Sequence, residues 1–173
     1  MKIHIMKLRI ICLIFFSLTF NSIYGQTQNY HSSKYNYSID IPNSFQKGQS
    51  RSLNNDLLFS DISGASINMI VVPHDPQIKS PHELSKEMFY SIFRDIDPNV
   101  KIFDDQKIVI NEKKVFKHVR TIKFKDTPDQ LNQVCFTYFD GDKQFILTLA
   151  CATFDYQKYK TKFDAVGKSV KFK

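Results

Sequence analysis

The chain has 173 residues, 14% of them aromatic but none of them Trp, and carries 24 Lys and Arg against 17 Asp and Glu. Three of these cations and no acid lie in residues 1–25, so the remainder holds 21 basic against 17 acidic side chains, a formal charge of +4. A chain of this size folds as one domain with a real core. So small a positive excess, without a recognised binding motif, argues against nucleic acid as a partner.

The first 25 residues have the three parts of an export signal. Lys2, Lys7 and Arg9 form a basic start, and an apolar run follows from Ile10 to Phe20. This run is too short to span a bilayer, and a small residue, Gly25, stands where a signal peptidase would cut. We therefore predict cleavage after Gly25 and a single domain over residues 26–173. The protein is expected to be exported, periplasmic or extracellular, without a transmembrane anchor.

Alternating apolar residues predict three strands in the first half of this domain. Apolar and polar residues alternate over Tyr35–Pro42, where proline ends the pattern. Leu57–Ile62 and Ala65–Val72 flank a Ser-Gly turn and are the second and third strands. We expect these three strands to form an antiparallel meander.

Residues 80–83 read Ser-Pro-His-Glu, a capping box with proline at the first helical position. This predicts a helix from Ser80 to the Asp97-Pro98 stop. Apolar residues at intervals of four form a stripe that should pack on a sheet; they are Leu84, Met88 and Ile92, widened by Phe89 and Phe93.

The second half reads as two hairpins, a helix and a short tail. The first hairpin joins Ile108–Ile110 to Lys114–Phe124, and the second joins Leu131–Phe139 to Gln144–Thr153 around an Asp-Gly turn. A helix follows over Asp155–Lys168, and an apolar-containing tail ends the domain. The predicted class is α+β: an α/β/α sandwich whose mostly antiparallel sheet of about six strands carries helices on both faces.

The cysteines are predicted to be free. Cys12 leaves with the signal, and Cys135 and Cys151 lie on the two strands of the second hairpin. In the register set by its turn, Cys135 faces a residue near 146–148, which separates the two Cα atoms by about 10 Å or more, beyond disulfide reach. Because apolar strands raise a thiol pKa, a catalytic role is the weaker interpretation.

Both ends of the domain carry a family likeness. The strand Tyr35–Pro42 is followed by aromatic Phe45, and the hairpin Phe136–Ala152 leads into a helix with Tyr159, Phe163 and Val166 before the final Ser-Val-Lys-Phe. These segments resemble the PsbP-like and Mog1-like superfamily. The resemblance implies an α/β/α sandwich and an accessory or adaptor role rather than an enzymatic one. It transfers no functional residue to this chain.

A basic strand is the only candidate binding site that the sequence offers. Six cations without an acid fall within residues 113–125: Lys113, Lys114, Lys117, Arg120, Lys123 and Lys125. In a period-two strand, Lys113, Lys117, Lys123 and Lys125 share a side with Val115, Val119 and Thr121, and could meet an acidic partner or anionic lipid headgroups. The alternative is that these lysines deter edge-to-edge aggregation of an exposed strand.

Other candidate sites are incomplete. Asp95, Asp97 and Asn99 match the start of a calcium loop, but Val100 and Gln106 replace its glycine and its bidentate glutamate. His74 and His82 match no metal signature, and His118 has no nucleophile or carboxylate at a motif spacing. We therefore expect no catalytic residues, metal ligands or cofactors.

The sequence thus favours an exported, non-enzymatic accessory protein that binds a protein partner. The alternatives are a small-ligand or divalent-metal carrier, with a pocket between the first helix and the sheet near Asp95–Asp105, and a hydrolase.

Overall fold

The computed structural model describes residues 26–50, 52–125 and 129–173. The predicted export signal lies outside the described residues. The described ranges contain ten strands: β1 (Thr27–Ser32), β2 (Tyr37–Pro42), β3 (Gln46–Lys47), β4 (Asn55–Ser60), β5 (Ser66–Pro73), β6 (Lys101–Ile110), β7 (Lys113–Ile122), β8 (Leu131–Asp140), β9 (Lys143–Ala152) and β10 (Lys171–Phe172). The helical segments are η2 (Pro81–Glu83), α2 (Lys86–Phe93), η3 (Thr153–Asp155) and α3 (Tyr156–Lys168).

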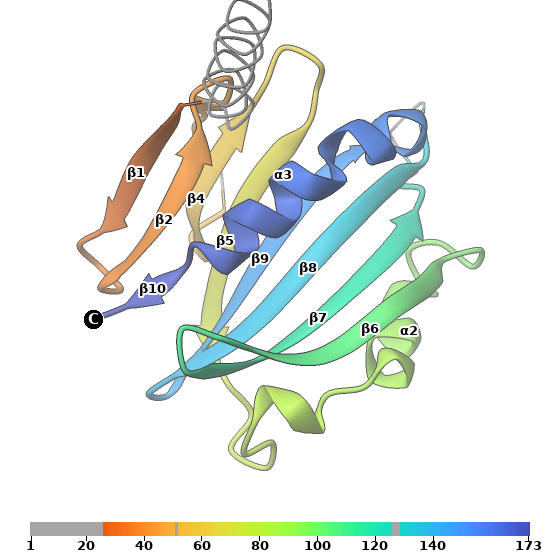
Figure 1. The fold of residues 1–173 in the computed structure, drawn as a ribbon. Coiled ribbons are helices and arrows are strands. Elements are labelled where there is room, and N and C mark those ends of the chain that lie inside the picture. The colour runs from red at the N-terminus through yellow and green to blue at the C-terminus, as the bar shows by residue number, and fades with distance from the viewer. Residues whose placement is uncertain (1–25, 51, 126–128) are drawn as a thin grey trace, which may run out of the picture.

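The strands form two antiparallel sheets. Seven strands make the main sheet in the order β3-β4-β5-β9-β8-β7-β6, and β1-β2-β10 make a small second sheet (Figure 1). Helix α3 and the small sheet cover one face of the main sheet, and η2 and α2 cover part of the other near β6 and β7. The prediction of an α+β sandwich with helices on both faces is confirmed, with seven strands in the main sheet rather than about six.

Each face of the main sheet has its own core. The larger core joins α3 and β2 to the inward residues of β5, β7, β8 and β9, and contains Tyr37, Leu147 and Phe163. The smaller core lies under η2 and α2 and contains Leu84, Phe89 and Phe116. Because successive strand residues point to opposite faces, both cores draw on the same strands. Within the described ranges, no helix is long and apolar enough to cross a membrane.

The predicted N-terminal meander is wrong for its first strand, and correct in pairing the second with the third. Strand β2 pairs with β1 and β10, whereas β4 pairs with β5 in the main sheet. The alternation of Tyr37, Ile39 and Ile41 correctly indicates one buried face, but a buried face does not identify the neighbouring strand. Strand β1 was not predicted, because its mostly exposed residues show no apolar alternation.

The first helix is interrupted. The hydroxyl of Ser80 accepts a hydrogen bond from the backbone N of His82 at 3.2 Å, but this cap begins only the one-turn η2. Leu84 is extended, with φ −68° and ψ 149°, and α2 begins at Lys86. The break changes which residues face the sheet, so Met88 and Ile92 of the predicted buried stripe are 40% and 59% exposed.

The second hairpin has the predicted register. Cys135 is opposite Thr148 and Cys151 is opposite Asn132, so the two cysteines are not paired neighbours. Both are free and buried, and burial raises the pKa of Cys151 to about 11, with Asp155 and Asp61 adding to the effect. The prediction of two free, buried thiols is confirmed.

Candidate functional site

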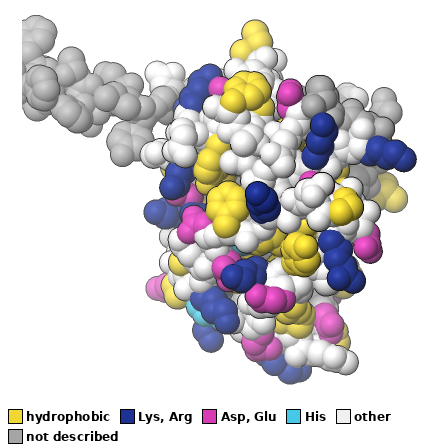
Figure 2. Space-filling view, turned by 90° about the vertical axis from the view of Figure 1, so that its right-hand side faces the viewer, with side chains coloured by type: hydrophobic (Ala, Val, Ile, Leu, Met, Phe, Trp, Pro, Cys, Tyr) yellow, Lys and Arg dark blue, Asp and Glu magenta, His cyan; other side chains and the backbone are white. Residues whose placement is uncertain are grey.

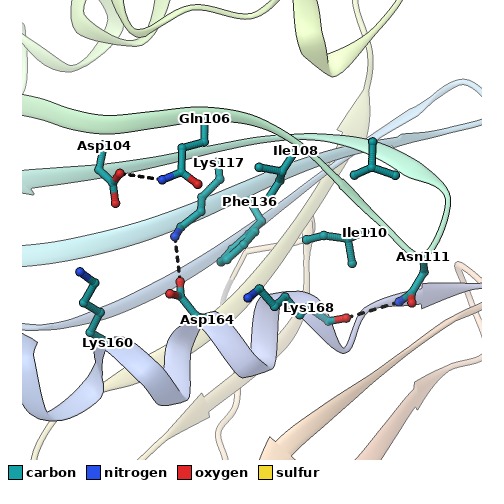
Figure 3. Close-up of a pocket in the computed structure, with 11 residues that line it drawn as sticks. Asp104, Gln106, Ile108, Ile110, Asn111, Lys117, Phe136, Lys160, Asp164 and Lys168 are labelled. Atoms are coloured by element: carbon teal, nitrogen blue, oxygen red, sulfur yellow. Dashed lines mark hydrogen bonds and ion pairs between the residues drawn. The ribbon is translucent and has the colours of Figure 1, made fainter.

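A groove of about 600 Å³ lies between edge strand β6 and helix α3, which run side by side along it (Figure 3). Strand β6 forms one wall, α3 forms the other, and residues of β7 and β8 form the floor. We call it the β6–α3 groove. Its lining residues are Asp104, Gln106, Ile108, Val109, Ile110, Asn111, Lys117, Phe136, Lys160, Asp164 and Lys168.

The groove exists because α3 covers only part of the sheet. The helix packs on β8, β9 and β2, and leaves β6 beyond its edge. A Cβ atom on Gly167 would lie 2.3 Å from the ring of Phe136, so only glycine allows this approach to β8. The hydroxyl of Tyr138 donates a 2.6 Å hydrogen bond to the carbonyl of Gly167 and holds the helix end there.

A β-bulge shapes one end of the β6 wall. The register of β6 against β7 shifts between Phe103 and Gln106, and Asp104 has φ 54°. A left-handed residue in a bulge turns a side chain out of the regular alternation, and such bulges often border binding sites. Gln106 Nε2 donates to Asp104 Oδ1 at 2.7 Å. The carboxylate of Asp104 is thereby placed at the same end of the groove as Lys160 (Figure 3).

The β6–β7 turn fixes the other end. Asn111 and Glu112 both have positive φ, 47° and 66°, as a two-residue hairpin turn requires. Asn111 Nδ2 donates to the carbonyl of Val170 at 2.8 Å. The turn is thus tied to the chain that follows α3, which sets the width of the groove at this end.

Charged side chains alternate along the helical wall. Lys160, Asp164 and Lys168 project from α3 into the groove (Figure 3). Lys117 is 8% exposed, and its Nζ lies 2.9 Å from Asp164 Oδ1 and 5.8 Å from the centre of the Phe136 ring. Within the described residues neither Lys160 nor Lys168 forms an ion pair. The groove therefore offers two free ammonium groups flanking a neutralised pair.

The four predicted partner-binding lysines do not form one stripe. Lys113 pairs with Asp140 at 2.6 Å, and Lys117 pairs with Asp164 in the groove. Lys123 and Lys125 are exposed beyond the end of β7, where the backbone N of Lys123 donates to Asp97 Oδ2 at 2.8 Å. Figure 2, which views the side that is at the right in Figure 1, shows charges of both signs mixed with apolar side chains.

Arg120, another cation of the basic strand, points to the face of the main sheet that α2 covers, opposite the face of the groove. Its guanidinium lies 3.6 Å from the Phe93 ring centre of α2, and its Nε donates to Gln133 Oε1 at 2.6 Å. These contacts assign Arg120 to holding α2 on the sheet.

Sequence reasoning missed the helical wall of the groove. Lys160, Asp164 and Lys168 recur at intervals of four, a pattern that is also typical of a solvated helix face. The position of Gly167 within an apolar stripe was the only sequence signal that α3 approaches a strand closely.

The structure also brings His118 and Cys135 together. They are opposite each other on β7 and β8 and are fully buried, so no substrate could reach them. Burial, with a contribution from Arg120, lowers the pKa of His118 to about 3, and its Nδ1 lacks a hydrogen-bond partner. A histidine with so low a pKa is a poor general base near neutral pH. His118 packs against the smaller core, with its ring centre 4.5 Å from that of Phe89 and 5.6 Å from that of Phe116.

Of the residues that match the start of a calcium loop, Asp97 has a structural role. Asp97 is buried, and its carboxylate accepts hydrogen bonds from the backbone N atoms of Asn99 and Lys123, at 2.9 and 2.8 Å. Nowhere in the described ranges do three or more His, Cys, Asp or Glu gather to hold a metal.

A second hollow of about 450 Å³ does lie between α2 and β6, where the carrier hypothesis placed its pocket. Its lining offers one carboxylate and two ammonium groups, an unsuitable set for a divalent cation. The lining residues are Lys86, Glu87, Tyr90, Val100, Lys101 and Ile102.

His74 and His82 make separate contacts. His74 stacks on Phe139 with ring centres 5.1 Å apart. His82 Nε2 lies 2.9 Å from the carbonyl oxygen of Ile108 in β6. Neither imidazole takes part in a metal-like cluster in the part of the chain that the structure describes.

Comparison with solved structures gives the same fold at very low sequence identity. The cyanobacterial PsbP (CyanoP) of Synechocystis is 13% identical, with a TM-score of 0.66, covering 86% of this chain and 94% of its own. The Ran-binding protein Mog1p of Saccharomyces cerevisiae is 5% identical, with a TM-score of 0.60, covering 85% and 95%. LpqN of Mycobacterium tuberculosis, described as involved in cell envelope biogenesis, is 8% identical, with a TM-score of 0.50, covering 84% and 89%.

Sequence comparison identifies the family. No relative was found among curated protein sequences. The PsbP family model, however, matches residues 25–172, nearly the whole of the predicted mature domain. The two ends that carry the sequence likeness, strand β2 and the β8–β9–α3–β10 segment, lie within this match and within the sandwich seen here. The chain therefore belongs to the PsbP family.

Proposed function

We propose that this chain is an exported, non-enzymatic accessory protein of the cell envelope, and that it binds a protein partner through the β6–α3 groove. The observation that carries the proposal is the groove itself: it is lined by charged and apolar side chains on two regular elements, and it holds no nucleophile paired with a base. Rigid walls of this kind suit recognition of another chain.

Three further features support this proposal. The basic start and apolar run of residues 1–25 favour export. Among proteins of the same fold, LpqN is described as involved in cell envelope biogenesis and Mog1p as a Ran-binding protein. The histidine and cysteine that could suggest catalysis, His118 and Cys135, are fully buried and are not among the residues that line the groove.

Site-specific photocrosslinking in the native host tests the proposal. A photoreactive residue at Gln106, on the groove wall, should crosslink to one partner protein, which should then bind the purified chain with a fixed stoichiometry. The matched control is Lys107, the next residue on β6, which is also exposed. Lys107 is opposite Phe116 in the register with β7, so its side chain lies on the face of the sheet away from the groove. Equal crosslinking from both positions, or none from Gln106, would contradict a groove-specific partner.

A further inference from the structure

We infer that the β6–α3 groove binds an extended acidic segment of the partner, with carboxylates four residues apart. This inference rests on the proposed function and adds the chemistry of the partner. It follows from the spacing and charge state of the two groove walls.

The cation spacing on α3 matches an extended peptide. Lys160 and Lys168 are eight residues apart, which at a helical rise of about 1.5 Å per residue separates them by about 12 Å along the axis. In an extended chain, residues i and i+4 point to the same side about 13 Å apart. Two carboxylates at these peptide positions therefore reach both ammonium groups at once.

The centre of the helical wall is neutral. Asp164, halfway between the two lysines, is 2.9 Å from Lys117 Nζ, and the Lys117 side chain is only 10% exposed. Lys117 thus cancels the acid that would repel an anionic peptide, and only Lys160 and Lys168 remain as uncompensated charges of this wall. The peptide residue at i+2 would face the ion pair and should be small and polar.

The opposite wall is apolar at its centre. Ile108 is half-buried and Ile110 is 7% exposed, and both side chains lie on the groove side of β6. Side chains at i+1 and i+3 of an extended peptide point away from α3 and toward β6. The groove therefore favours the pattern acidic, apolar, small polar, apolar, acidic.

Asp104 opposes this preference at one end. Its carboxylate lies at the same end of the groove as Lys160, on the opposite wall, and weakens attraction of an acidic residue there (Figure 3). Asparagine also tolerates the left-handed conformation found at this position, so Asp104→Asn removes the charge without a new backbone strain. This substitution should strengthen binding of the acidic peptide by about twofold to threefold, as expected for one exposed charge pair.

NMR titration of the mature domain tests the inference at affinities as weak as millimolar. The probe is a blocked five-residue peptide, Glu-Val-Ser-Val-Glu. Amide shifts should change at Gln106, Ile108, Lys160 and Lys168. Two control peptides, one with glutamine at both ends and one of the same composition with its glutamates adjacent, should bind several times more weakly.

Charge-reversal variants locate the binding. Changing Lys160 and Lys168 together to Glu should weaken binding about tenfold, since each attraction becomes a repulsion. The matched control changes Lys162 and Lys158 to Glu; both are exposed lysines of α3 outside the groove lining, and the net-charge change is the same. This control should change affinity by less than twofold.

Several results would overturn the inference. These are absence of groove shifts at several millimolar peptide, equal affinity for the glutamine peptide, or equal weakening by the Lys158 and Lys162 control. Concentration-dependent groove shifts without peptide would assign the groove to a second copy of the chain instead. A partner that still crosslinks to Gln106 after reversal of Lys160 and Lys168 would leave the proposed function standing and remove only the acidic segment.

Discussion

Replacing Gly167 by alanine should destabilise the fold by about 2 kcal/mol. The new Cβ atom would lie 2.3 Å from Cε2 and Cζ of Phe136, whose ring is fully buried at the floor of the β6–α3 groove. Overpacking of this kind typically costs about 1–3 kcal/mol. The better helix propensity of alanine returns about 1 kcal/mol. Because 2.3 Å is far inside van der Waals contact, we take the overpacking cost as about 3 kcal/mol, and the gain in helix propensity reduces the net loss to about 2 kcal/mol.

Urea unfolding followed by circular dichroism measures this loss. For a domain of this size it corresponds to a fall in Tm of about 4–8 °C. Thr161→Ala is the matched control, because Thr161 is an exposed residue of the same helix. It should be neutral or stabilising by a few tenths of a kcal/mol, roughly the propensity difference alone.

A double-mutant cycle identifies the cause. Phe136→Leu removes the ring atoms that the new Cβ meets, at its own cost of about 1 kcal/mol. In that background Gly167→Ala should cost less than about 1 kcal/mol, giving a coupling of about 1 kcal/mol or more. A Gly167→Ala protein as stable as the wild type, or a cycle without coupling, would refute the close approach of α3 to β8.

Three other predictions concern buried polar groups. Burial lowers the pKa of His118 to about 3 in the folded chain, so below a pH of about 6.5 the unfolded chain binds a proton at this residue and the folded chain does not. The free energy of unfolding should therefore fall by up to about 1.4 kcal/mol for each pH unit below about 6.5. In urea titrations at about pH 5 to 6.5, His118→Leu should remove this pH dependence. Asp164→Asn should destabilise the fold by about 2 kcal/mol because it leaves the buried Lys117 ammonium unpaired. Lys117→Met leaves the more exposed Asp164 carboxylate unpaired and should cost less than about 1 kcal/mol. Equal losses of stability in the two variants would refute this asymmetry. Cys135 and Cys151 should both react with a thiol reagent in urea but remain unreactive in buffer at pH 8, where a thiol pKa of about 11 leaves Cys151 with about a hundredfold less thiolate than usual.

The sequence predicted the elements whose signals are local and strong. The turn signal at Asp140-Gly141 correctly located the hairpin, whose two-residue loop is Gly141-Asp142, and with it the register of β8 and β9 and the separation of Cys135 from Cys151. The apolar repeat of Tyr159, Phe163 and Val166 correctly indicated the buried face of α3. In both cases a short pattern decides the conformation and the buried face together.

Features that depend on contacts between distant segments were not predicted. The placement of β2 depends on its pairing with β10, about 130 residues away, and no pattern within β2 encodes that partner. Only three residues of β6 were predicted, because the Asp104 bulge and the exposed edge remove its alternation. The groove combines this bulge, Gly167 and the helical lysines, and each of them alone is an ordinary sequence feature.

The protection of β6 explains why recognition in the groove should depend on side chains. An exposed edge strand can bind another strand through its backbone. Here the bulge at Asp104 breaks the regular ladder, because the register of β6 shifts between Phe103 and Gln106. This irregularity opposes strand addition. The groove side of the same strand remains open, and its neighbours on α3 are two ammonium groups that form no ion pair with any residue the structure describes, at a separation that suits an extended chain. Affinity should therefore follow peptide charge and salt concentration more than β-propensity, and a peptide that bound equally well at high salt would contradict this reasoning.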